Sequence, residues 1–232
     1  NLIVSFTKAM ASGDRIMEVF DLKPGIISGE GRKGEDQTYA VEMENVQFSY
    51  TKDAAPALSD IHLKIRQGET VGIIGGTGSG KSTLVQLIGR FYDADQGRVK
   101  VFGIDVKDYD LQELRSKIGM VPQRAVLFHG TIRENLKVGK ENASEKEMYE
   151  ALKTAQALEV AESKEDGLDA MISEGGKNLS GGQRQRLTIA RALVRKPQIL
   201  ILDDSASALD FATDARLRRA LKEDTENMTV FL

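Results

Sequence analysis

The sequence contains no cysteine, which excludes disulfides and thiolate-bound metals and fits a reducing compartment. Its net charge is only −3, with acids and bases interspersed, so nothing indicates a nucleic-acid partner or binding to an anionic membrane surface. No stretch reaches the roughly 18 consecutive apolar residues that span a bilayer, and no signal peptide is visible. Repeats and low-complexity tracts are missing too. His62 and His129 lack neighbours at metal-ligand spacing, so a zinc site is unsupported.

The chain does have enough apolar residues, 41% of 232, for the core of one large domain or of a domain with a subdomain. Both ends stop within a pattern. The first residues carry Ile16, Val19 and Phe20 at helical spacing, and the last five, "MTVFL", are an apolar strand without a terminator. We therefore expect a C-terminally truncated fragment of a longer polypeptide.

The pattern divides the chain into three segments. Residues 1–22 are predicted to be a helical tail, and residues 23–38, rich in glycine and charge, a linker. The domain proper spans 39–232. It opens with alternating apolar residues, typical of half-exposed antiparallel strands, at Val41, Met43, Val46, Phe48, Ile61, Leu63 and Ile65.

The continuous apolar run "TVGIIG", residues 70–75, predicts a buried central strand. Further strands are expected near 99–102 and at "KIGMVP". A helical insert of about 125–195 follows, where Ser144 and Glu147 form a capping box. Its apolar stripe consists of Met148, Leu152 and Ala155.

The core resumes at "QILIL" and closes with a helix around 212–221. We predict an α/β fold with an N-terminal antiparallel β subdomain and an inserted α-helical subdomain.

The stretch "GGTGSGKS", residues 75–82, matches G-x-x-x-x-G-K-[ST] and stands between the predicted buried strand and the amphipathic run "STLVQLIGRF". Glycines let successive backbone N–H groups point at phosphate oxygens, and the following helix adds the positive end of its dipole. Lys81 is expected to reach the terminal phosphates, and Ser82 to ligate Mg²⁺. The motif predicts a P-loop NTPase with a RecA-like core. Its expected nucleotide contacts are Gly75, Gly76, Thr77, Gly78, Ser79, Gly80, Lys81, Ser82 and Thr83.

A second strand, "ILIL", ends in Asp203 and Asp204, and a parallel sheet would bring this end beside the P-loop. Asp203 is the expected second Mg²⁺ ligand. Asp204 could position the attacking water, cap the following turn, or be the truncated remnant of a catalytic glutamate. Losing one C–C bond, about 1.5 Å, matters because misplacing a reactive group by about 1 Å costs on the order of a hundredfold in rate.

The stretch "LSGGQ", residues 179–183, precedes a long amphipathic helix and forms a second helix start suited to anions. Its expected phosphate contacts are Ser180, Gly181, Gly182 and Gln183. Either both helix starts serve one nucleotide within the monomer, or the second closes over the nucleotide of another copy. Four arginines that follow the signature are interpreted mostly as a solvated helix face and are assigned to no site: Arg184, Arg186, Arg191 and Arg195.

The P-loop, "LSGGQ" upstream of "ILILDD", and "SALD" directly after it resemble the ATP-binding-cassette (ABC) transporter family, specifically the nucleotide-binding domain of an exporter half-transporter. The resemblance covers roughly 39–232, and "LSGGQ" is the family's own signature. It implies an ATPase that uses ATP and Mg²⁺ and is coupled to transmembrane transport. It also implies a head-to-tail dimer with two ATP molecules, each held between the P-loop of one domain and the signature of the other.

Further residues enter only through this resemblance. Tyr50 matches the aromatic that stacks on adenine. Gln123 matches the glutamine that senses Mg²⁺, acts in catalysis and couples to the membrane domain. Glu174 resembles the acidic loop that contacts the coupling surface of exporters, and Asp210 closes the loop that crosses the dimer interface.

Two departures from the family pattern bear on turnover. Asp204 stands where a glutamate is usual, and the switch histidine expected past the last strand is missing because the chain ends at Leu232. The first departure is characteristic of one partner in heterodimeric exporters, where one composite site is degenerate. This domain would then hold slowly hydrolysed ATP while its intact signature completes the partner's site. In a homodimer, Asp204 would instead be the working base.

The resemblance also implies a transmembrane domain in the same polypeptide, with the segment ending at Phe20 as the tail of its last helix. That favours an exporter over an importer subunit and predicts a place at the cytoplasmic face of the cell membrane. Two rival functions are a non-hydrolysing, ATP-dependent dimerisation switch and a soluble cassette ATPase acting on DNA or the ribosome. The transported substrate and the partner subunit cannot be read from these residues.

Overall fold

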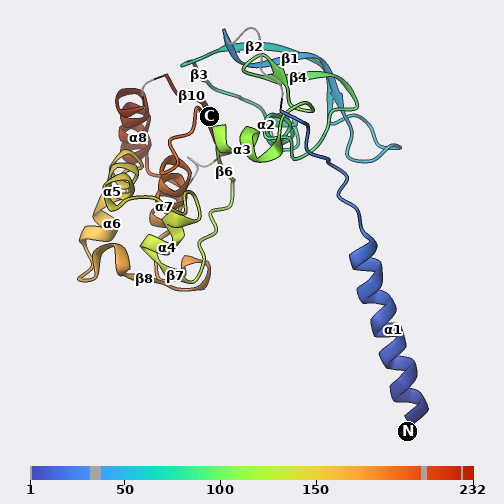
Figure 1. Ribbon diagram of the computed structural model, residues 1–232. Coiled ribbons are helices and arrows are strands. Elements are labelled where there is room, and N and C mark those ends of the chain that lie inside the picture. The colour runs from blue at the N-terminus through green and yellow to red at the C-terminus, as the bar shows by residue number, and fades with distance from the viewer. Residues whose placement is uncertain (1, 32–37, 205–207, 226) are drawn as a thin grey trace.

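The computed structural model describes residues 2–31, 38–204, 208–225 and 227–232. Figure 1 shows an α/β body in which one sheet lies at one end and helices gather at the other, while the N-terminal helix α1 (Leu2–Asp21) extends away from it. α1 has no buried residue. Within the described ranges, no helix has both the length and the apolar character needed to cross a membrane.

The first sheet is antiparallel and forms the N-terminal β subdomain. Its strands, in sheet order, are β2 (Leu58–Arg66), β1 (Tyr39–Phe48), β4 (Gln96–Val101) and β5 (Ile104–Asp105). β1 lies in the interior of the sheet and is nearly continuously buried, whereas β2 lies at the edge and shows more exposed positions. The prediction of antiparallel strands here is confirmed.

The second sheet is parallel and carries the chemistry-bearing loops. Its strands, in sheet order, are β3 (Thr70–Val71), β10 (Thr229–Phe231), β9 (Ile199–Leu202) and β6 (Ile118–Val121). β9 is apolar throughout because both of its faces are covered. Leu200 and Leu202 belong to the core of the helical region, whereas Ile199 and Ile201 pack into the core beneath the antiparallel sheet. A period-two side-chain alternation thus lets one strand join two cores.

The prediction for "TVGIIG" is wrong in two respects. Only β3, two residues long, pairs as a strand, and it lies at the edge of the described sheet instead of the centre. Ile74 is 98% exposed. An apolar run shows that a segment can be buried, but strand order decides which segments have neighbours on both sides.

Helices α2 (Lys81–Ile88) and α3 (Leu111–Lys117) connect the two sheets. The region between β6 and β9 is mainly helical. It contains β7 (Gly130–Thr131), α4 (Ile132–Lys137), α5 (Glu145–Thr154), α6 (Leu158–Glu162), η1 (Gly167–Asp169), β8 (Met171–Ile172), η2 (Glu174–Gly176) and α7 (Gly181–Leu193). After β9 comes α8 (Phe211–Asp224).

The helix starts in this region follow local rules. The predicted capping box at Ser144 is confirmed, since its side chain accepts from the backbone of Glu147 and the Glu147 carboxylate accepts in return. The predicted stripe is also confirmed, because Met148, Leu152 and Ala155 are buried. α5 packs against the signature-bearing helix α7.

The predicted linker is only partly described, since 32–37 lie outside the described residues. Residues 22–31 form no regular helix or strand, as expected. Gly29 and Gly31 nevertheless hydrogen-bond to the backbone ahead of α3, so this stretch is attached to the domain.

Candidate active site

The P-loop lies between β3 and α2, as its sequence context predicts. Gly78 and Gly80 have φ values of 80° and 88°, in the left-handed region that glycine adopts without strain. Lys81 begins α2, and its ammonium group donates to the carbonyl oxygens of Gly75 at 2.6 Å and Gly76 at 2.9 Å. The lysine therefore lies across the concave side of the loop, where it can meet phosphate.

Of the three predicted Mg²⁺ ligands, Ser82, Gln123 and Asp203, the first and last are in direct contact. The Ser82 hydroxyl, in the first turn of α2, donates to Asp203 Oδ1 at 2.9 Å. Asp203 follows β9, and its backbone N–H donates to the oxygen of Val121 at 3.0 Å, which holds the carboxyl ends of β9 and β6 side by side. The parallel order β3, β10, β9 thus brings together Ser82 and Asp203, which are 121 positions apart in the chain.

Gln123 and Asp204 also meet, although 81 positions separate them. The Gln123 amide nitrogen donates to Asp204 Oδ2 at 3.0 Å. Asp204 has φ 48°, a left-handed conformation that aspartate tolerates better than most residues. The alternative that Asp204 caps the following turn concerns 205–207, which lie outside the described residues.

Three of the predicted site residues border one cavity of about 180 Å³. Lys81, Asp203 and Asp204 line its polar side, and the ends of β9 and β10 line its apolar side. Arg218 of α8 also lines it and is held by Asp214, whose Oδ2 accepts from Arg218 Nε at 2.7 Å. Two cationic side chains, Lys81 and Arg218, and two carboxylates, Asp203 and Asp204, therefore share one cavity.

Tyr50 lies beside the P-loop helix. Its hydroxyl shares a 2.8 Å hydrogen bond with Thr83, and the residue is 53% exposed. Phe48 and Tyr92 contact it edge-on, with ring centroids 5.0 Å and 5.3 Å away. Tyr92 was missed by the sequence reasoning; its position directly after the P-loop helix in "GRFYD" is the signal that could have found it. An exposed ring face held by two neighbours can stack on a planar base.

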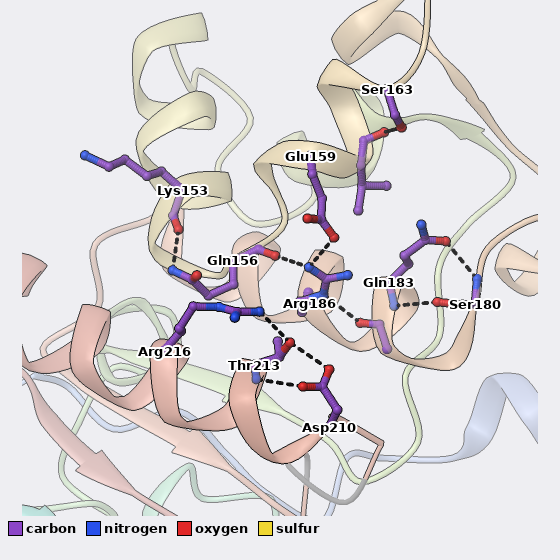
Figure 2. A network of polar contacts seen from close by, with 12 residues as sticks. Lys153, Gln156, Glu159, Ser163, Ser180, Gln183, Arg186, Asp210, Thr213 and Arg216 are labelled. Atoms are coloured by element: carbon purple, nitrogen blue, oxygen red, sulfur yellow. Dashed lines mark hydrogen bonds and ion pairs between the residues drawn. The ribbon is translucent and has the colours of Figure 1, made fainter.

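The signature forms the start of α7, which is capped by a capping box. Ser180 accepts from the backbone N–H of Gln183 at 3.2 Å, and the Gln183 side chain accepts from the Ser180 N–H at 2.9 Å (Figure 2). Ser180 and Gly181 are exposed. Residues 180–183 are not among those that line the cavity at the P-loop. Ser180 and Gln183 therefore bond to each other, and the signature's exposed end stands apart from the P-loop cavity of this chain.

Arg186, one turn further along α7, fixes this helix start. Its Nη1 donates to Glu159 Oε1 at 2.8 Å and to the backbone oxygen of Gln156, and its Nε donates to the Gly182 oxygen at 3.4 Å. Figure 2 shows the guanidinium pointing between Gln156 and Glu159. The interpretation of these arginines as a solvated face is wrong for Arg186. Its side chain is only 12% exposed, because α6 covers it.

The remaining predicted residues lie near the signature. Glu174 is exposed at the start of η2, a short helix that precedes the signature in the chain. Asp210 caps α8, and hydrogen bonds from the side chain and backbone of Thr213 lower the pKa of its carboxyl. The oxygen of Ala208 would lie 3.4 Å from a Cβ placed on Gly182, so the turn before α8 adjoins the signature. The signature "LSGGQ" and the turn that ends at Asp210 thus lie side by side.

Residues 58–207 match the family model described as "ABC transporter". The chain belongs to the ABC transporter family. The α/β P-loop prediction and the family resemblance are confirmed. The enzyme class predicted from the resemblance, an ATPase coupled to transport, is that of this family's ATP-binding domains. ATP is the nucleotide that these domains bind.

The ABC transporter ATP-binding protein YfiB of Bacillus subtilis is 47% identical over 95% of this chain and 38% of its own length. The ATP-dependent lipid A-core flippase of Vibrio vulnificus is 39% identical over 100% of this chain and 40% of its own length. The structure of a bacterial Atm1-family ABC exporter with ATP bound superposes with a TM-score of 0.88 at 30% identity, over 97% of this chain and 39% of that one. The chain therefore spans about two fifths of the length of these relatives.

Proposed function

We propose that this chain is the ATP-hydrolysing motor of an ABC exporter, with a nucleotide site of its own that turns over slowly. The observation that carries the proposal is the paired contact at the end of the parallel sheet, Ser82 with Asp203 and Gln123 with Asp204. A flippase and an exporter are among the proteins that this chain resembles. This proposal extends their activities to the present chain.

The site's own groups divide the work of hydrolysis. P-loop amides and Lys81 hold and neutralise the terminal phosphates, and the Tyr50 ring stacks on adenine. Gln123 holds Asp204 through the 3.0 Å bond, so the carboxylate is oriented towards the cavity in which an attacking water would lie.

The donor set fits Mg²⁺. Ser82 and Asp203 offer a hydroxyl and a carboxylate oxygen within 2.9 Å of each other, and Gln123 offers an amide oxygen. Oxygen donors of this kind are those that Mg²⁺ prefers. When bound there, the ion would supply positive charge to the β- and γ-phosphate oxygens.

Slow turnover follows from the length of the Asp204 side chain. Aspartate places its carboxylate about 1.5 Å short of the position that glutamate would reach. The signature is intact, so this domain would complete the active site of a partner while its own P-loop retains ATP. The structural support is that the tip of α7 lies outside the P-loop cavity of its own chain, which leaves it available to a second ATP-binding domain.

The partner that transmits the motion is a transmembrane domain, which would place this chain at the cytoplasmic face of the membrane. An exposed apolar patch supports this part of the proposal. Val126 and Phe128, just after Gln123, are 47% and 55% exposed. Such side chains beside a nucleotide-contacting residue suit the docking of another domain. α1, exposed along its whole length, would lead to that domain.

The direct test is ATP binding by the Lys81→Ala variant. Titration calorimetry with Mg-ATP should show binding by the unmodified chain and none by the variant, because the loop loses its only side-chain cation among residues 75–82. Lys52→Ala, which changes an exposed lysine in a loop, is the matched control and should bind normally. Equal affinity of the unmodified chain and the Lys81 variant would contradict the P-loop assignment.

A second candidate, an ATP-dependent dimerisation switch without turnover, is favoured by Asp204 itself. A phosphate-release assay distinguishes the motor from the switch. A switch dimerises on ATP without releasing phosphate, even when its partner is present. The soluble cassette ATPase acting on nucleic acid remains a weaker alternative. A salt-sensitive gel shift with DNA or RNA would support it.

A further inference from the structure

The linker stretch from Ser28 to Gly31 runs alongside the turn that precedes α3. The backbone N–H of Gly29 donates to the oxygen of Tyr109 at 2.8 Å, and that of Gly31 donates to the oxygen of Asp108 at 3.0 Å. Two backbone bonds from residues two apart fix both the position and the direction of the linker.

A side-chain contact adds to these bonds. The Ser28 hydroxyl donates to Asp110 Oδ2 at 3.0 Å and accepts from the backbone N–H of Leu111 at 2.9 Å. Asp110 is the N-cap of α3, where its other oxygen accepts from the N–H groups of Gln112 and Glu113. Ser28 therefore completes the cap of a helix 82 residues further along the chain.

The close approach requires glycine at one position. A Cβ on Gly29 would lie 2.5 Å from both the carbonyl carbon and the oxygen of Asp108, a backbone contact that no rotamer change can relieve. Gly25, in the same linker, has nothing within 4 Å of its would-be Cβ. The two glycines thus provide a matched pair: one is needed for docking and the other is not.

Residues 108–111, on which the linker lies, are connected to the P-loop helix by hydrogen bonds. Just before these residues, the oxygen of Lys107 accepts from Arg90 Nη1 at 3.2 Å. Just after them, Arg115 of α3 donates to the oxygens of Gly89 and Arg90 at 3.4 Å and 3.1 Å. Gly89 and Arg90 directly follow the last turn of α2, the helix that begins with Lys81.

Residues 108–111 are also connected to Gln123, through α3 and β6. Tyr109 is buried, and its hydroxyl donates to the oxygen of Val101 at 2.9 Å, so the turn cannot move independently of the sheet. α3 then runs without a break into β6, and β6 ends two residues before Gln123. Short rigid elements therefore connect Ser28–Gly31 to both sides of the ATP site, while on the other side the linker continues into α1.

We propose that Ser28–Gly31 docks on residues 108–111 to couple the N-terminal helix to the ATP site, with Gly29 as the positioning residue. This inference rests on the proposed function, because it assumes that the site binds ATP. Coupling between two sites is reciprocal: if docking strengthens ATP binding by some factor, ATP must strengthen docking by the same factor. A passive anchor would show neither effect.

The first measurement is amide hydrogen exchange in the unmodified chain, Gly29→Ala and Gly25→Ala. The Gly31 amide should be protected in the unmodified chain and in Gly25→Ala, and should exchange freely in Gly29→Ala. Ser28→Ala, which adds no bulk, should lower protection to a smaller extent. Fast exchange at Gly31 in the unmodified chain would overturn the docking itself.

The second measurement is the Mg-ATP dissociation constant of the same variants, with exchange repeated at saturating Mg-ATP. We expect Gly29→Ala to weaken binding by about fivefold or more, the lower end of typical allosteric coupling. Saturating Mg-ATP should slow exchange at Gly31 by a similar factor in the unmodified chain. Gly25→Ala should change neither quantity.

The outcomes separate the two proposals. If the unmodified chain fails to bind Mg-ATP, the proposed function is wrong. If it binds but Gly29→Ala binds equally well, and Mg-ATP leaves Gly31 exchange unchanged, the docking is a passive anchor and the coupling is refuted. Thermal unfolding of each variant checks that any loss of ATP affinity occurs in a folded chain.

Discussion

Replacement of Asp204 by glutamate should raise the rate of ATP hydrolysis by about a hundredfold. The Asp204 carboxylate lines the cavity and accepts from the Gln123 amide at 3.0 Å, and Asp203 bonds separately to Ser82. One more C–C bond advances the carboxylate by about 1.5 Å. A displacement of about 1 Å in a reacting group changes rates by on the order of a hundredfold.

A competing effect is backbone strain at this position. Asp204 has φ 48°, and a residue other than glycine, asparagine or aspartate pays roughly 1 to 2 kcal/mol there. A hundredfold gain in rate corresponds to about 2.7 kcal/mol of barrier height. Strain lowers the free energy of unfolding, whereas the gain concerns the transition state. The variant should therefore be slightly less stable and much faster.

The assay is phosphate release from Mg-ATP over protein concentrations that cover dimer formation. Asp204→Asn is the matched control, because it keeps the size of the side chain and removes its charge, and it should abolish the residual rate. The reasoning is refuted if the unmodified chain already hydrolyses ATP as fast as the glutamate variant. It is equally refuted if both variants leave the rate unchanged.

Three further outcomes are expected. Tyr50→Ala should weaken Mg-ATP binding by about tenfold in calorimetry, since base–aromatic stacking contributes roughly 1–3 kcal/mol, whereas Tyr50→Phe, which loses only the bond to Thr83, should bind more nearly normally. Leu152→Ala, at a side chain with 0% exposure, should lower the free energy of unfolding by about 2–5 kcal/mol in urea titrations, with m unchanged. A hydrogen bond from Lys140 lowers the pKa of Glu147 to about 2, below its usual 4.5. The stability that ionised Glu147 contributes to the fold is therefore fully present above pH 4.5 and is lost as the pH falls towards 2. In Glu147→Gln, the free energy of unfolding should fall less steeply with decreasing pH over this range.

Features set by a few neighbouring residues could be predicted from the sequence. The capping box at Ser144 and Glu147 depends on a spacing of three residues, and the structure has it. The meeting of Ser82 with Asp203 could be predicted as well, because parallel strands place their carboxyl ends at one edge of a sheet. Local rules and one topological rule were sufficient for these.

Features that depend on distant partners could not be predicted in this way. The edge position of β3 depends on which strands pair beside it, and the burial of Arg186 on how α6 lies over α7. The docking of Gly29 depends on a turn almost 80 residues away. A glycine in a linker is expected to be flexible, so nothing in the local pattern distinguishes Gly29 from Gly25.

The segment after Gln123 contacts the signature-bearing helix α7. Arg191 of α7 donates from Nη2 to the oxygen of Val126 at 3.0 Å, and its guanidinium lies 5.6 Å from the centre of the Phe128 ring. Burial lowers the pKa of Arg191, and within the described part of the chain its Nη1 has no hydrogen-bond partner, so this side chain is held at an energetic cost. Since Gln123 contacts Asp204 and Arg191 lies on the helix that begins at Ser180, the segment from Gln123 to Phe128 lies between the acidic end of β9 and the signature-bearing helix.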